Sequence, residues 1–155
     1  MSQSSQLAID SPVRTIEFSQ FASQPSPTGH FEGIVTTLGV VYVTAITRDG
    51  CSGCEEQKPL FKDLAQRMTT SHPGLVSFSK IHVRYSDVDM SQSREAKKVL
   101  RHAAYPTYAI HVRSKFGPLE VYRAIYPSMD ELEKQVRESL DLAEYYKADA
   151  EKPTN

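Results

Sequence analysis

The sequence predicts an α/β protein, a three-layer α/β/α sandwich in which helices cover both faces of a central mixed sheet. Residues 40–47 form a β-branched and almost continuously apolar run, which is typical of a strand buried on both of its faces. Strand-like and helix-like periodicities alternate around this run, and a strand hairpin followed by a helix ends the pattern. A βαβ half followed by a ββα half, with short connections, favours one sheet between two layers of helices.

The first half of the chain is predicted to alternate strands and helices. A short strand at residues 13–18 is followed by a loop at 19–29, where prolines and glycine accumulate. The helical spacing of Phe31, Ile34, Val35 and Leu38 predicts a two-turn helix that ends at Gly39, just before the central strand. Beyond that strand we expect a long helix that ends near residues 71–74, a second core strand at 75–83 and a second long helix at 91–102.

The second half is predicted to be a hairpin and a last helix. Residues 108–112 and 119–125 are strand-like, and the turn between them contains Gly117 and Pro118. Ser128 with Glu131 three residues later forms a capping box, and an apolar stripe at helical spacing follows it. The last helix is therefore expected to begin at about residue 129.

Length and composition point to one domain. The chain has 155 residues, of which 39% are hydrophobic and 24% charged, as in an ordinary globular domain. A formal net charge of −1 provides no basic field for a phosphate backbone, so we expect no nucleic-acid partner. We place the folded domain at residues 13–146, between a Ser- and Gln-rich tail at 1–12 and a charged tail at 147–155, both expected to be flexible.

The two cysteines of the chain form one Cys-x-x-Cys motif, Cys51-Ser52-Gly53-Cys54. The motif follows the predicted central strand and opens a helix, where free backbone N–H groups and the helix dipole stabilise a thiolate on Cys51. Two intervening residues bring the second sulfur close to the first within one helical turn. Cys51 can then attack a disulfide, and Cys54 can resolve the mixed disulfide. Thiol–disulfide exchange is the predicted chemistry.

Two other interpretations of the cysteines stay open, half of a zinc site and incidental thiols. A tetrahedral zinc site would need two more ligands, and no second Cys-x-x-Cys exists. The five histidines show no ligand-like spacing, and each is expected to be a surface residue or one whose polar groups are satisfied. We therefore predict no metal site and no bound cofactor.

The motif and its context resemble the thioredoxin family over about residues 13–146. Pro59 matches the family's helix-kinking proline, and Tyr105-Pro106-Thr107 precedes a strand as the family's cis-proline segment does. The resemblance implies that Tyr105 and Pro106 contact an extended substrate segment by strand-like pairing. It also implies that Lys80 is the strand lysine behind the motif, whose charge would favour the thiolate if it is buried there; a lysine snorkelling from a strand edge is the other interpretation.

The sequence departs from the family pattern at several positions. Gly50 stands where thioredoxins carry a tryptophan, Ser52-Gly53 replaces Gly-Pro, Ala45 occupies the site of a buried aspartate, and Ile125 replaces a glycine. Loss of the aspartate removes a candidate general base. Three acidic residues are expected to bring negative charge close to the sulfurs: Asp49, Glu55 and Glu56.

The predicted function is thiol–disulfide exchange with protein or small-thiol substrates, more as a reductase than as an oxidase. Its partners would be disulfide-containing proteins and, by the resemblance, a reductase that supplies electrons. The alternative is a non-catalytic thioredoxin-fold module that binds an extended segment or senses redox state. The longest apolar run is too short to span a bilayer and the first ten residues lack a signal-peptide pattern, so a cytoplasmic protein without membrane insertion is expected.

Overall fold

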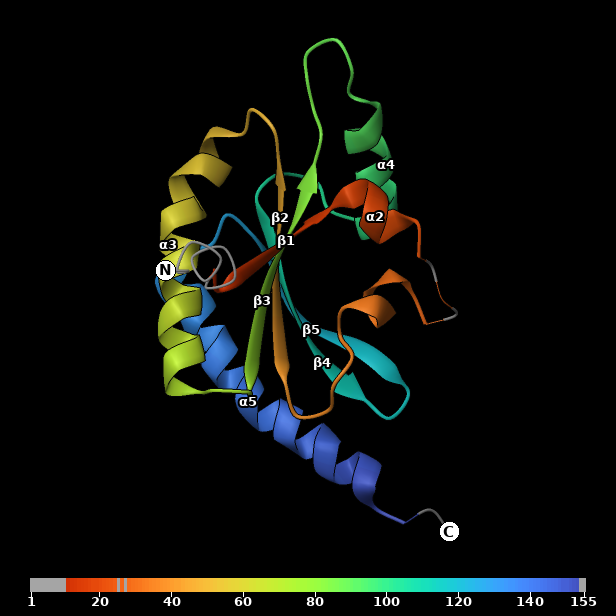
Figure 1. Cartoon of the computed structure of the whole chain (residues 1–155), viewed down its shortest axis with the longest axis vertical. Coiled ribbons are helices and arrows are strands. Elements are labelled where there is room, and N and C mark those ends of the chain that lie inside the picture. The colour runs from red at the N-terminus through yellow and green to blue at the C-terminus, as the bar shows by residue number, and fades with distance from the viewer. Residues whose placement is uncertain (1–10, 25, 27, 154–155) are drawn as a thin grey trace, which may run out of the picture.

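Five strands form one mixed sheet in the computed structural model, which describes residues 11–24, 26 and 28–153. The strands lie in the order β1-β3-β2-β4-β5 (Figure 1). β1 and β2 run parallel to β3, whereas β4 runs antiparallel to β2 and to β5. The strands are β1 (Val13–Glu17), β2 (Val41–Arg48), β3 (Val76–Val83), β4 (Thr107–Ser114) and β5 (Gly117–Ile125).

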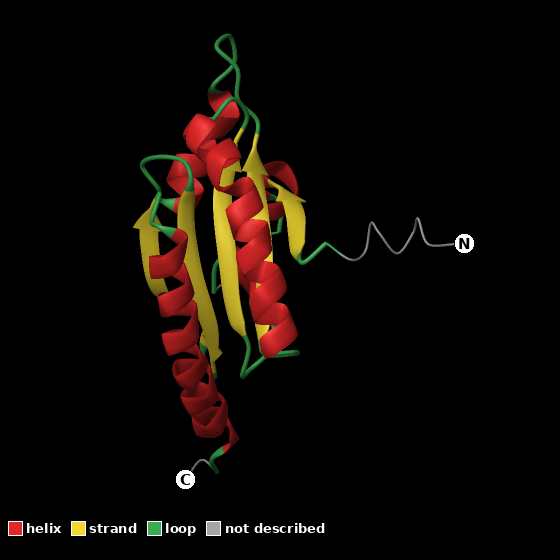
Figure 2. Cartoon of the chain, turned by 90° about the vertical axis from the view of Figure 1, so that its left-hand side faces the viewer, coloured by secondary structure: helices red, strands yellow, loops and turns green. Residues whose placement is uncertain are grey.

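Helices cover both faces of this sheet, which confirms the predicted three-layer sandwich. α3 and α5 lie on one face, in front of the sheet in Figure 2, and α2, α4 and a single 3₁₀ turn, η1, lie on the other. The helices are α2 (Phe18–Ala22), η1 (His30–Gly33), α3 (Ser52–Ser71), α4 (Ser91–Leu100) and α5 (Met129–Glu151).

Each face of the sheet has its own hydrophobic core. The predicted central strand is β2, the middle strand of the sheet, and it contributes side chains to both cores. β2 is buried along its whole length except at Arg48, as expected for a strand with a helix layer on each side. Leu64 of α3 and Leu132 of α5 pack on one face. Phe21 of α2 and Leu100 of α4 pack on the other. The carboxyl end of β2 leads directly to the Cys-x-x-Cys motif at the start of α3.

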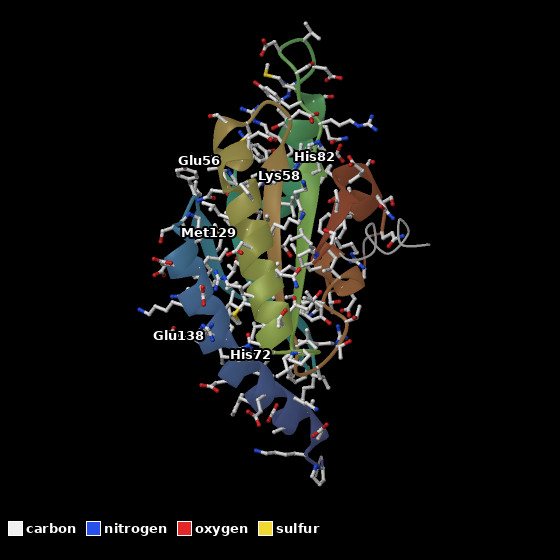
Figure 3. All side chains as sticks on the ribbon, turned by 60° about the vertical axis from the view of Figure 1, so that its left-hand side comes forward. Glu56, Lys58, His72, His82, Met129 and Glu138 are labelled. Carbon is white, nitrogen blue, oxygen red and sulfur yellow. A yellow bond between two sulfur atoms is a disulfide. The ribbon has the colours of Figure 1, made fainter. Side chains whose placement is uncertain are left out.

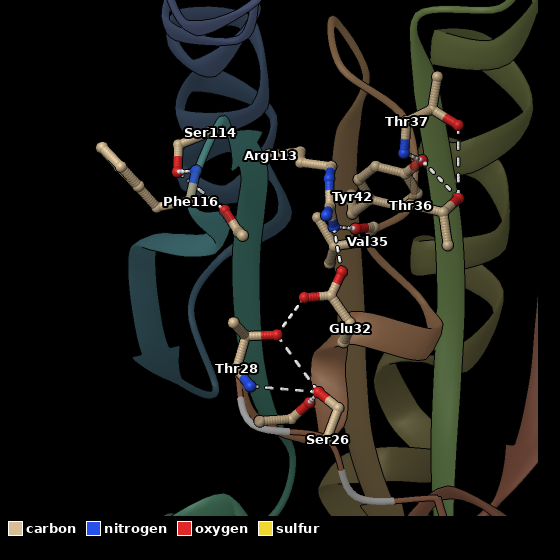
Figure 4. A network of polar contacts seen from close by, with 12 residues as sticks. Ser26, Thr28, Glu32, Val35, Thr36, Thr37, Tyr42, Arg113, Ser114 and Phe116 are labelled. Carbon is tan, nitrogen blue, oxygen red and sulfur yellow. Dashed lines mark hydrogen bonds and ion pairs between the residues drawn. The ribbon is translucent and has the colours of Figure 1, made fainter. Parts of the chain in front are cut away.

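The predicted helix at residues 31–38 is wrong. Only His30–Gly33 are helical, as a 3₁₀ turn. The polar groups that a longer helix would pair internally have tertiary partners instead: the Val35 carbonyl accepts from the Arg113 guanidinium at 2.9 Å, and the Thr37 N–H donates to the Tyr42 hydroxyl at 2.9 Å (Figure 4). The apolar spacing reflects burial of Ile34 and Val35 against the core, which periodicity alone does not distinguish from a helix.

Two further boundaries differ from expectation. The predicted loop at residues 19–29 begins with the short helix α2, because Phe18 and Phe21 are buried in the core beneath it. α5 continues to Glu151, so residues 147–151, predicted as part of a flexible tail, are helical. An ion pair between Lys115 and Asp149 at 3.5 Å links its last turns to the β4–β5 hairpin. The tail predicted at 1–12 lies outside the described residues as far as residue 10.

The other predicted elements are present with ends shifted by up to three residues. The strands expected at 75–83, 108–112 and 119–125 are β3, β4 and β5, and the helix expected at 91–102 is α4. Ser128 caps α5, since its hydroxyl oxygen accepts from the Glu131 N–H at 3.1 Å. None of the helices among the described residues combines the length and the hydropathy that crossing a bilayer requires.

Candidate redox site

Cys51 and Cys54 are joined by a disulfide at the amino end of α3, with their Cα atoms 5.2 Å apart. Cys51 is the N-cap of the helix, and its sulfur accepts a hydrogen bond from the Cys54 N–H at 3.1 Å. Both residues are nearly buried, at 7% and 6% exposure. An N–H donor and the positive end of a 20-residue helix at the Cys51 sulfur are suited to stabilise a thiolate once the disulfide is reduced.

The turn that presents the motif explains the glycine before it. Gly50 has a φ of 67°, in the left-handed region that favours glycine over a residue with a side chain. The preceding residue, Asp49, is held at the end of β3: its carboxylate accepts from the Tyr85 N–H at 3.2 Å and lies 2.8 Å from the His82 Nε2. The hydrogen bond from Tyr85 lowers the pKa of Asp49. This carboxylate therefore has its own partners, although the sequence only predicts it to be near the sulfurs.

Pro106 faces the motif from the end of the loop before β4. The Tyr105–Pro106 peptide bond is cis. A Cβ atom added to Gly53 would lie 3.3 Å from the Pro106 Cδ, so the proline ring and the motif backbone are in contact. The side chain of Tyr105 lies elsewhere, since its hydroxyl is 3.0 Å from the Ser93 hydroxyl on α4. Of the predicted pair, Pro106 is at the motif, whereas the Tyr105 ring is packed against α4.

Tyr126 is a site residue that the sequence analysis missed. It follows β5 with a φ of 50°, and its N–H donates to the Pro106 carbonyl at 2.9 Å. Its ring carbon Cε1 would lie 3.2 Å from a Cβ on Gly53, and its hydroxyl donates to the Glu56 carboxylate. This hydrogen bond raises the pKa of Tyr126. The ring thus covers the middle of the motif, and no local pattern predicts this because β5 is far from α3 in the sequence.

A buried chain of hydrogen bonds lies near Ala45, the position at which the resemblance to thioredoxins places a buried aspartate. Ala45 is paired with Tyr108 of β4. The Tyr108 hydroxyl donates to the Gln57 Oε1 at 2.9 Å, and the Gln57 Nε2 donates to the Pro127 carbonyl at 2.7 Å. Both side chains are buried, and burial raises the pKa of Tyr108 well above its usual value. A neutral hydrogen-bonded chain therefore occupies this region, with no ionisable carboxylate among its members.

Lys80 lies close to Cys54, in the lining of the same cavity. It is half-buried on β3, next to Ala45 in the β2–β3 pairing, and it lines a cavity together with Cys54 and Lys58. Burial, followed by the charge of Lys58, lowers the pKa of Lys80. The structure thus brings the predicted lysine to the cavity beside the second cysteine.

The histidines differ from the expectation that each is exposed or satisfied. His102 and His111 are buried, and among the described residues neither ring nitrogen of His102 has a hydrogen-bond partner, nor has the Nδ1 of His111. The Nε2 of His111 lies 3.6 Å from the Glu120 carboxylate. Among the described residues no group of three or more His, Cys, Asp or Glu side chains is placed to hold a metal ion.

The sheet order, the two helix layers and the disulfide at the start of α3 define a thioredoxin-fold protein with a Cys-x-x-Cys pair, and comparison with known proteins agrees. No protein-family model and no curated protein matches the chain. Among solved structures, Trichomonas vaginalis thioredoxin is similar with a TM-score of 0.60 and 7% identity, over 83% of this chain and 98% of that one. The Trx4 domain of ERdj5 follows with a TM-score of 0.56 and 14% identity, over 84% and 97% of the two chains.

A third similar structure is thioredoxin f2 in a complex of ferredoxin:thioredoxin reductase and thioredoxin f2. Its TM-score is 0.52 at 16% identity, over 82% of this chain and 94% of that one. The identities are low, so the likeness concerns the fold. The chain has the thioredoxin fold, and a Cys51–Cys54 disulfide lies at the start of its helix α3.

Proposed function

We propose that the protein is a thiol–disulfide oxidoreductase that reduces the disulfides of protein substrates or of oxidised small thiols. The observation that carries the proposal is the Cys51–Cys54 disulfide at the amino end of α3, with the Cys54 N–H bonded to the Cys51 sulfur and Pro106 against the motif. In this arrangement Cys51 is the nucleophile and Cys54 the resolving thiol. The backbone beside Pro106 would accept the substrate segment, as would Tyr105 through its main chain.

The reaction balances over two exchange steps. The Cys51 thiolate attacks one sulfur of the substrate disulfide, forms a mixed disulfide and releases the other substrate sulfur as a thiolate, which takes up a proton. Cys54 then loses its proton, attacks the Cys51 sulfur and releases the second substrate thiolate. The substrate gains two electrons and the protein is left with the Cys51–Cys54 disulfide. A separate reductase must return these two electrons, and the thioredoxin f2 complex supports a partner of that class.

Lys80 has a proposed electrostatic role in the second step. It lines the same cavity as Cys54, and a nearby ammonium favours the thiolate form of a cysteine. The direction of electron flow depends on the reduction potential of the pair and on its compartment. Reduction is the direction we propose, in a reducing compartment such as the cytoplasm.

Replacing Cys54 with Ser tests this function. A nucleophilic Cys51 that lacks its resolving partner should stay attached to substrates, so a mixed disulfide that is released by dithiothreitol should accumulate. The Cys51→Ser variant is the matched control and should form no such adduct.

A non-catalytic binding or redox-sensing module is the second candidate. It is favoured by the Tyr126 ring over Gly53 and by the 7% exposure of Cys51, which both limit access to the sulfur. Under this alternative the Cys54→Ser variant would retain its partners without a covalent bond, and both cysteine variants would behave alike.

A further inference from the structure

A cavity of about 300 Å³ opens beside Cys54. It lies between α3 and the adjoining parts of β1, β2 and β3, and neither Cys51 nor Pro106 nor Tyr126 lines it. Figure 3 shows two of its lining residues, Lys58 on α3 and His82 on β3, at the same end of the molecule. Its volume is at the lower end of the range for small-molecule pockets.

The polar lining of the cavity is predominantly positive. Among the described residues, three lysines contribute to it, Lys58, Lys62 and Lys80, against the one carboxylate of Glu55, whereas the Arg48 guanidinium is turned away over the Tyr85 ring. Within the described parts of the chain, none of the three ammonium groups forms an ion pair with a carboxylate at 4.0 Å or less. The cavity therefore has a surplus of cationic donors that are not neutralised by its own lining.

The inner wall of the cavity is apolar. Ala45, Phe61 and Val13 line it, and the ring of Tyr108 lines it while the Tyr108 hydroxyl is bonded to Gln57. His82 also belongs to the lining, and its Nε2 is engaged by Asp49. Apolar walls with a few cationic groups are the usual composition of a site that binds an organic acid by its hydrocarbon body and its charged end.

We propose that this cavity binds a small organic anion, with an apolar body against Ala45, Phe61 and Tyr108 and a carboxylate or similar acid group among the three lysines. Such a ligand would cover the Cys54 side of the redox pair and leave the Pro106 side free. It would therefore limit the reaction of Cys54 with small reagents without blocking the face that we assign to substrate.

Benzoate is a suitable probe, and the uncharged benzyl alcohol is its matched control. Calorimetric titration of the full chain should show binding of benzoate at one site and at least about tenfold weaker binding of benzyl alcohol, since only the acid can form charge-assisted contacts. In amide NMR spectra, benzoate should shift the signals of Ala45, Cys54 and Lys80. Benzoate should also slow alkylation of Cys54 in a reduced Cys51→Ser variant, where only one thiol remains.

Lysine variants locate the site. Lys80→Met should weaken benzoate binding about tenfold, and so should Lys58→Met, whose exposed side chain can be replaced without disturbing the core. Lys134→Met on α5 removes the same charge far from the cavity and should bind as the original chain does. Equal affinity for benzyl alcohol, equal weakening by all three variants, or benzoate shifts outside the cavity would overturn the proposal. None of these measurements requires turnover, so they test anion binding independently of the proposed oxidoreductase function.

Discussion

The ring of Tyr126 covers part of the redox motif. Its main-chain N–H is bonded to Pro106, its ring lies against Gly53 and its hydroxyl is held by Glu56. A tyrosine with a φ of 50° is in a conformation that costs about 1–2 kcal/mol for residues other than glycine. The contacts with Pro106, Gly53 and Glu56 therefore hold the ring over the motif, and we expect Tyr126 to restrict which substrates reach it.

Replacing Tyr126 with Gly should open the motif to large substrates. The change removes the ring and relieves the left-handed backbone, so kcat/KM for a protein disulfide should rise about threefold or more, with little change for a small disulfide. Tyr126→Phe is the control, because it keeps the ring and loses only the hydrogen bond to Glu56. Steady-state reduction of insulin and of a small aromatic disulfide provides the comparison. An equal fall for both substrates would instead make the ring part of the binding surface.

At the scale of elements, α3 is connected to the rest of the site by the chain of hydrogen bonds from Tyr108 through Gln57 to Pro127. These three residues belong to β4, α3 and the loop before α5. Gln57 satisfies both ends of its buried amide in this way. The start of α3, and the motif on it, therefore has a fixed position relative to the segment that carries Tyr126.

Tyr108→Phe should destabilise the fold, because the buried Gln57 Oε1 loses its donor. Leaving a buried acceptor unsatisfied costs about 1–3 kcal/mol, which chemical denaturation measures directly. Tyr145→Phe on α5 is the matched control, since Tyr145 is 59% exposed and its loss of a hydroxyl should change the free energy of unfolding by less than about 0.5 kcal/mol. If the two variants had the same free energy of unfolding, the buried hydrogen bonds of Tyr108 and Gln57 would not contribute to the stability of the fold.

For the whole molecule, two buried histidines lie where the layer of α2, η1 and α4 meets the sheet. His111 of β4 stacks on Phe31 with ring centroids 4.1 Å apart, and His102 meets Tyr105 edge-on at 4.6 Å. Burial lowers the pKa of each to about 4, assisted at His102 by the charges of Lys97 and Arg123 and opposed at His111 by the Glu120 carboxylate. Both rings are therefore neutral at pH 7, and protonation of either ring disfavours the folded state.

The free energy of unfolding should therefore fall as the pH drops from about 6.5 toward 4. In this window the unfolded chain binds protons on both histidines and the folded chain does not, so each can lower stability by as much as about 1.4 kcal/mol per pH unit. Urea denaturation at pH 7, 6 and 5 measures the slope. The double variant His102→Gln and His111→Gln should have a flatter profile over that window. If stability fell equally with pH in the original chain and in the double variant, His102 and His111 would not be the source of the pH dependence.

Local patterns determined most of the fold and the reactive pair. The buried run that became β2, the hairpin, the Ser128 cap and the two cysteines at the start of a helix are all features that neighbouring residues specify by periodicity and capping chemistry. The helix expected at 31–38 failed because its polar groups have partners on β2 and β4, which local spacing does not contain.

Tertiary structure alone decided what surrounds the disulfide. Tyr126, Gln57 and Tyr108 come from three separate segments of the chain, and only the pairing of β2, β4 and β5 and the packing of α3 bring them together. The cavity with Lys58 and Lys80 also depends on how α3 lies over β3. The available chemistry was therefore predictable from the amino-acid sequence, because reactivity follows residue type and position in a helix. Access to that chemistry was decided by long-range packing, whose partners a local pattern cannot identify.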